Sequence, residues 1–367
     1  MPYYVRLCIK LLMLFLLGSI AYLGRGIIVP IYFSILLAIL LLPLANAIER
    51  LKIPRAFADL TAVLSAVIVI VLLIYFLSTQ ISSFVSDVPS IKKHLTEHYV
   101  TLRDWVSHKF NISFTQQTVF IRNTTKEITN SGGEYVGQTF SSLTETLIVI
   151  VLVTIYTFLI LFYRHLIRRF ILAVFIKEHL SRVEEVLAES KSMVKNYMLG
   201  LLTEMAIIAT VNSIILLCLG IKYAIFLGIF IAILNLVPYI GIITGILFTV
   251  LVTLTTSSNA NDILWIIISL GIVHIVDSNI LMPRIVGSKV KINALMAITG
   301  VLFGGSLMGL AGVFLALPTL AILKIIFDRV DGLEPWGILL GDEVHVKRSK
   351  LSSRLKKATD KIIPEKE

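Results

Sequence analysis

Residues Tyr223 to Asn261 read YAIFLGIFIAILNLVPYIGIITGILFTVLVTLTTSSNAN, a run of 39 residues without Asp, Glu, Lys or Arg. A single helix of this length would measure about 58 Å, roughly twice the thickness of the hydrocarbon core of a bilayer. Within the run, Pro238 removes a backbone donor and Gly241 permits a sharp turn. The run therefore predicts two apolar helices separated by a break at NLVPYIG, Asn235 to Gly241.

The composition of the whole chain points the same way. Of its 367 residues, 57% are hydrophobic and only 15% are charged, and the mean hydropathy is +0.90, which is outside the range of soluble globular domains. Two cysteines, Cys8 and Cys218, are too few for a disulfide scaffold, and the hydrophobicity excludes a disordered chain. We expect an all-α polytopic membrane protein.

Further stretches without charged residues mark the other membrane elements, since a spanning helix needs about 20 mostly apolar residues. They are Leu11–Gly24, Gly26–Ile48, Leu60–Ser86, Leu147–Tyr163, Met205–Ile221, Ile263–Leu281 and Ile292–Leu323. A signal peptide is the alternative for the first stretch, but a second apolar stretch follows at once without a clear cleavage site. The count is about eight elements, including hairpins broken by proline or glycine.

Changes in composition along the chain predict four regions. Residues 1–86 form N-terminal transmembrane helices, and residues 87–146 form an exposed helical insertion, because charged residues are scattered there among aliphatic ones. Residues 147–328 form a transmembrane core that includes an interfacial helix over 164–200. Residues 329–367 form a basic tail.

The distribution of basic residues predicts the orientation. The net charge of +10 arises at the ends of apolar stretches and in the tail, where residues 345–367 carry eight Lys and Arg against three acids. This pattern disfavours nucleic-acid binding and places short basic loops, such as Arg50 to Arg55, in the cytoplasm. We expect both termini to be cytoplasmic and the insertion to lie outside.

The break at Asn235, Pro238 and Gly241 is the first candidate for a polar pathway. Irregular backbone at membrane depth is tolerated only against protein or a watery cavity, where the freed amides and carbonyls can contact an ion or polar solute. The alternative is a simple helical hairpin whose tip reaches water.

The second candidate is HIVDSNILMP, His274 to Pro283. His274, Asp277 and Ser278 share one helix face, and Asn279 follows. An aspartate near the centre of a span costs about 2.5 to 3.5 kcal/mol on insertion scales, so it indicates a proton or cation site unless it lies at the interface. Glu204 is weaker, because an acid at the start of the Met205 run also suits a helix N-terminus.

A series of small and helix-breaking residues in the last part of the chain is expected to serve helix packing or gating, with a pore lining as the alternative. The series comprises Pro283, Gly287, Gly304, Gly305, Gly309, Gly312 and Pro318. No metal-ligand spacing, phosphate loop or catalytic triad occurs in the sequence, so we expect neither an enzyme nor a cofactor.

Three segments together closely resemble the autoinducer-2 exporter family of bacterial permeases. They are LGIKYAIFLGIFIAILNLVPYIG, NILMPRIVG and GGSLMGLAGVFLALPTLAILKII, at residues 219–241, 279–287 and 304–326. The chain departs from the family pattern at His274, where glutamine is frequent, and at Ala294, where proline is frequent. The resemblance implies a homo-oligomeric multi-pass protein of the bacterial inner membrane that exports autoinducer-2 or exchanges cations for protons.

Together these features predict a secondary transporter for a small polar solute or for Na⁺ and H⁺, with Asp277 as the coupling site. The rival from another class is a non-transporting membrane scaffold whose exposed insertion binds a partner. A channel is a third possibility that no selectivity motif supports.

Overall fold

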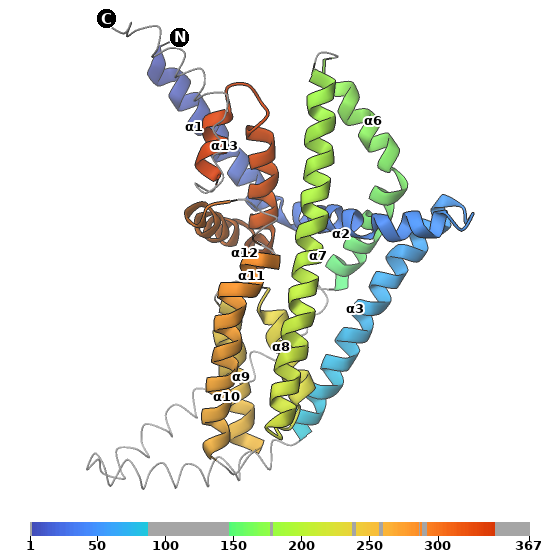
Figure 1. The fold of residues 1–367 in the computed structure, drawn as a ribbon. Helices are drawn as coiled ribbons and strands as arrows, with labels where there is room; N and C mark the ends of the chain where they lie inside the picture. The colour runs from blue at the N-terminus through green and yellow to red at the C-terminus, as the bar shows by residue number, and fades with distance from the viewer. Residues whose placement is uncertain are drawn as a thin grey trace, which may run out of the picture. The chain divides into compact units, whose positions relative to one another are not determined.

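The computed structural model describes residues 2–86, 147–176, 179–236, 240–256, 260–285, 287 and 292–341. The expected insertion at 87–146, the tail beyond 341 and Pro238 lie outside these residues. The helices are α1 (Tyr3–Leu23), α2 (Arg25–Glu49), α3 (Arg55–Ser86), an unlabelled helix (Leu147–Phe162), α6 (Arg164–Val174), α7 (Leu180–Cys218), α8 (Ala224–Leu234), α9 (Ile240–Thr256), α10 (Ala260–Val276), the π-helix η2 (Asp277–Leu281), α11 (Met282–Ile285), α12 (Ala294–Phe327) and α13 (Glu334–Leu340) (Figure 1).

Within the described ranges, six helices are long and apolar enough to cross a membrane, or seven if Leu147–Phe162 and α6 are counted as one bent span. In each of these six helices, no more than a third of the most apolar stretch is buried inside the protein. The remaining apolar side chains are available to lipid, which is the surface that a polytopic membrane protein needs. The predicted all-α membrane fold is confirmed.

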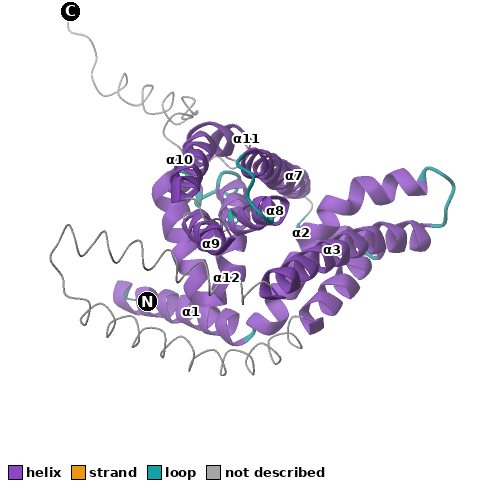
Figure 2. Cartoon of the chain, turned by 90° about the horizontal axis from the view of Figure 1, so that it is seen from below, coloured by secondary structure: helices purple, strands orange, loops and turns teal. Residues whose placement is uncertain are grey.

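The chain divides into two units, one of residues 1–174 and 194–287 and one of residues 175–193 and 288–367. The boundary falls within α7. In the first unit, one group of buried side chains joins α2 and α3 to the helix Leu147–Phe162 through Ala38, Val63 and Leu161. A second, larger group joins α7, α8, α9 and α10, and these four helices lie side by side in Figure 2.

The α8–α9 hairpin is packed so closely that several positions admit only glycine. A Cβ on Gly241 would collide with the carbonyl of Leu234, and a Cβ on Gly228 would collide with Ser213 of α7. The 11 residues of α8 rise about 16 Å, half of a bilayer core, before the chain turns at Asn235. Alone, α8 is therefore too short to cross a bilayer.

In the second unit, α12 is a helical hairpin, although its length alone would suit one long span. Gly309 interrupts it with φ 64° and ψ −148°, a conformation that is essentially restricted to glycine. The two halves approach where Gly304 faces Gly312 and where Gly300 faces Leu320. The small side chains of this segment thus let two helical backbones pack against each other.

Asn293 joins the start of this hairpin to α13. Its Oδ1 accepts a hydrogen bond from the Met296 amide at 2.9 Å, and its Nδ2 donates to the carbonyls of Leu339 and Gly341 at 2.6 and 3.0 Å. The asparagine is therefore both the N-cap of α12 and a link to the end of α13.

Candidate functional site

The turn of the α8–α9 hairpin contacts the π-helical turn that follows α10. Asn235 Nδ2 donates a hydrogen bond to Asp277 Oδ2 at 3.1 Å. Asp277 is 3% exposed, and Asn235 is half-buried. The two segments that the sequence singled out separately, NLVPYIG and HIVDSNILMP, therefore meet in one place.

A small cavity lies beside this contact, with room for about one water molecule. Its polar lining consists of Asn212 from α7, Asn235, His274 and Asp277, and its apolar lining includes Ile231 and Leu270. Two buried oxygens, Asn212 Oδ1 and Asp277 Oδ1, have no hydrogen-bond partner among the residues that the structure describes. A buried acceptor without a partner costs about 1 to 3 kcal/mol, so these oxygens indicate a site for a bound donor or cation.

Glu204 adds a second carboxyl group. It is 7% exposed on α7, and its carboxyl group is a neighbour of that of Asp277. The expectation that Glu204 lies at the start of a helix is wrong, because α7 begins at Leu180 and continues through this position to Cys218. The macrodipole of the helix N-terminus therefore does not account for this acid.

The geometry around Asp277 depends on a change in helix type. The chain passes from α10 into the π-helix η2 at this residue, and single π-helical turns are frequent at functional sites. His274 is half-buried and its Nδ1 lies 3.1 Å from Ser278 Oγ, while Asn279 Nδ2 donates to the Ile275 carbonyl at 2.8 Å. Ser278 and Asn279 are exposed and do not line the cavity.

The other residues predicted from the sequence are placed as follows. Gly241 is buried against the end of α8. Pro283 and Gly287 are exposed after η2. The second unit holds Gly304, Gly305, Gly309, Gly312 and Pro318. In the described part of the chain, no three His, Cys, Asp or Glu side chains are grouped as metal ligands.

Chemically, two carboxyl groups in contact can hold one proton between them, since only a protonated carboxyl can donate to the other. Alternatively, the Asp277 carboxylate and the amide oxygen of Asn212, which line the same cavity, can bind a small cation, which prefers oxygen ligands. Both occupants would change the charge of the site. Such a change biases the equilibrium between two conformations if only one of them exposes the site to a given side.

Sequence reasoning gave Glu204 little weight and missed Asn212. The available signal was their spacing: Glu204, Ile208 and Asn212 recur every four residues, which places them on one face of a helix. Hydropathy hides this spacing, because the apolar run begins at Met205 and leaves Glu204 just outside it. In the structure, Glu204 and Asn212 belong to one continuous helix.

The profile of a family described as AI-2E family transporter matches residues 10–332, which include α2 to α12 and every residue that lines the cavity. The chain belongs to the AI-2E transporter family. It is therefore a multi-pass membrane transporter of a solute.

Proteins with similar sequences occur in Bacillus subtilis and Escherichia coli. YrrI of Bacillus subtilis, a candidate transport protein, is 24% identical over 82% of this chain and 86% of its own length. YueF of the same organism, also a candidate transport protein, is 26% identical over 89% of this chain and 92% of its own. The AI-2 transport protein TqsA of Escherichia coli is 23% identical over 86% of this chain and 90% of its own.

Proposed function

We propose that this AI-2E family protein is a secondary transporter of the bacterial inner membrane. It exports a small polar solute such as autoinducer-2, or it exchanges a cation for protons, by alternating access. Ion binding at Asp277 and Glu204 couples transport to a gradient. The observation that carries the proposal is the contact of the buried Asp277 carboxyl group with Asn235, in the turn of the α8–α9 hairpin, beside the buried carboxyl group of Glu204.

The hairpin supports this proposal by its position. Because α8 turns back after about half a bilayer, its last carbonyls and the Asn235 amide lie where hydrocarbon would otherwise surround them. Broken helices that bring such groups to a site at membrane depth are a recurring design of secondary transporters. Asn235 then supplies a neutral polar contact, and Asp277 supplies the charge that an ion neutralises.

The name of one relative supports the solute class. TqsA is named for AI-2 transport, and autoinducer-2 is a small polar molecule. Cation and proton exchange is the second candidate, favoured by the unpartnered oxygens of Asn212 and Asp277. A non-transporting scaffold is the rival, and it predicts no flux at all.

The test is transport by the purified protein in liposomes with imposed proton or sodium gradients, reading internal pH, internal sodium and autoinducer-2. We expect gradient-driven flux in the wild type and its loss in Asp277→Asn. Asp262→Asn is the matched control, because it makes the same substitution in the first turn of α10, away from the cavity. It should transport as the wild type does.

Each result has one meaning. Flux that survives Asp277→Asn would move the coupling site elsewhere. Solute flux that is indifferent to both gradients would contradict secondary transport and indicate uncoupled export. The absence of flux for every solute and gradient, with the protein correctly folded, would favour the scaffold.

A further inference from the structure

α6 has two chemically different faces and no buried residue. Leu166, Phe170 and Val174 recur every four residues on one side, and Arg164 and Arg168 recur on the other, next to His165 and Arg169. A short helix with an apolar face opposite a basic one is typical of segments that lie along the membrane surface.

The direction of α6 agrees with this arrangement. It leaves the membrane-length helix Leu147–Phe162 at an angle of 70°. If that helix crosses the bilayer with an ordinary tilt of about 20°, α6 runs close to the membrane plane. Its apolar side chains then enter the acyl region and its arginines face the headgroups.

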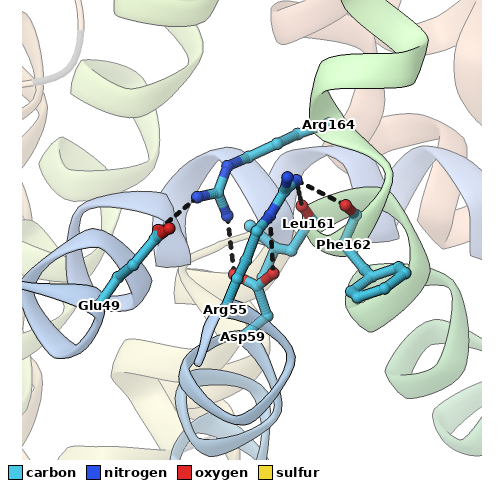
Figure 3. A network of polar contacts seen from close by, with 6 residues as sticks. All are labelled: Glu49, Arg55, Asp59, Leu161, Phe162 and Arg164. Atoms are coloured by element: carbon cyan, nitrogen blue, oxygen red, sulfur yellow. Dashed lines mark hydrogen bonds and ion pairs between the residues drawn. The ribbon is translucent and has the colours of Figure 1, made fainter. Parts of the chain in front are cut away.

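A network of charged groups attaches the start of α6 to the turn between α2 and α3 (Figure 3). Arg164 donates to Glu49 Oε2 at 2.6 Å and to Asp59 Oδ1 at 2.8 Å. Arg55, at the beginning of α3, donates to the carbonyls of Leu161 and Phe162 at 3.1 and 2.5 Å. These contacts hold the α2–α3 turn next to the start of α6.

This end of the helices is basic. Residues 49–59 and 164–174 contain six Lys and Arg and two acids, Glu49 and Asp59, both of which contact Arg164. Four of the six basic side chains are exposed. They are Arg50, Lys52, Arg168 and Arg169. Leu51, between the first two, is 73% exposed, as expected for an apolar side chain that enters lipid.

We propose that Arg50, Lys52, Arg168 and Arg169 form a binding surface for the headgroups of anionic phospholipids. The basic loop places this surface at the cytoplasmic leaflet by the positive-inside rule, and this leaflet carries the negative potential that attracts basic segments. The surface complements a phosphate by charge and an acyl chain by the apolar face of α6. The proposal does not depend on which solute the protein transports.

The test is lipid binding to the purified full-length protein in a neutral detergent, by native mass spectrometry with phosphatidylglycerol and phosphatidylcholine of the same chain length. We expect the wild type to prefer phosphatidylglycerol. Arg168→Gln with Arg169→Gln should weaken that binding about fivefold for each arginine, from the energy of a basic side chain near an anionic surface. Arg168→Lys with Arg169→Lys keeps the charge and should retain the preference.

A second pair keeps the test independent of the folding of α6. Arg50→Gln with Lys52→Gln removes two charges from the turn and should weaken phosphatidylglycerol binding to a similar degree. Lys191→Gln with Lys195→Gln, also two basic residues but on α7 outside the surface, is the control and should bind as the wild type does. Equal binding of the two lipids by the wild type, or an unchanged preference in both test pairs, would overturn the proposal.

Discussion

Asp277 is the residue on which the local chemistry depends. One of its oxygens accepts from Asn235. Among the described residues the other oxygen has no hydrogen-bond donor, and neither has the buried amide oxygen of Asn212, which lines the same cavity. The nearby carboxyl of Glu204 adds electrostatic repulsion, because two neighbouring carboxylates repel each other when both are ionised. A bound proton or small cation would reduce this repulsion and would give the buried oxygens a binding partner.

If Glu204 and Asp277 act as one site, their substitutions cannot be additive. We expect Glu204→Gln to abolish gradient-driven flux as Asp277→Asn does, and the double variant to be no worse than either single one. The measurement is proton and sodium flux in proteoliposomes. Glu185→Gln, an exposed position on α7, is the control. Independent, multiplicative losses would contradict a shared site.

At the scale of elements, the network around Arg164 fixes how three helices meet. Asp59 is fully buried, and Arg164 is its closest cation, since the Arg55 guanidinium is 3.7 Å away. Removing one partner of a buried ion pair leaves an uncompensated charge, whereas removing both can be nearly neutral. The network is therefore a sensitive point for stability.

We expect Arg164→Gln to destabilise the protein by about 3 kcal/mol and to lower the midpoint of thermal unfolding in detergent. Adding Asp59→Asn should restore part of the loss, because the buried charge that has lost its closest cation is then gone. Arg169→Gln, an exposed arginine of the same helix, is the matched control and should unfold as the wild type does. A double variant less stable than Arg164→Gln would show that the pair does not act through charge.

The α12 hairpin makes a second prediction at this scale. In a straight helix, Gly300 and Leu320 would be about 30 Å apart, whereas the turn at Gly309 brings them into contact. In a background with Cys8→Ser and Cys218→Ser, we expect Gly300→Cys with Leu320→Cys to form an intramolecular crosslink, detected by mass spectrometry of the digested protein. Gly300→Cys with Leu310→Cys, at the exposed bend, is the control pair and should crosslink poorly. A straight helix would crosslink neither pair.

At the scale of the whole molecule, the distribution of charge predicts the topology. The basic loops favour a cytoplasmic location for both termini, with residues 87–146 outside. We expect alkaline phosphatase fused at residue 120 to be active and green fluorescent protein fused at the C-terminus to be fluorescent. The reverse pattern would contradict this orientation and would move the proposed lipid surface to the other leaflet.

Much of the architecture follows from local patterns. The break expected between Asn235 and Gly241 is present, because α8 ends at Leu234 and α9 begins at Ile240. The start of α7 could not be predicted from hydropathy: charged residues line its first half, yet neither proline nor glycine interrupts it before Gly200. Polarity of the side chains does not end a helix, whereas a missing donor or a left-handed residue does.

From the sequence alone it follows that this protein is helical and polytopic and that its longest uncharged run breaks between Asn235 and Gly241. The physical reason is local: in lipid each backbone group must find its partner within its own helix, and only proline and glycine interrupt that pattern cheaply. Tertiary structure alone decided that Asp277 meets Asn235 and Glu204. That meeting depends on how the helices rotate and cross, which is set by close contacts such as that of Gly228 with Ser213 and cannot be read from the periodicity of any one segment.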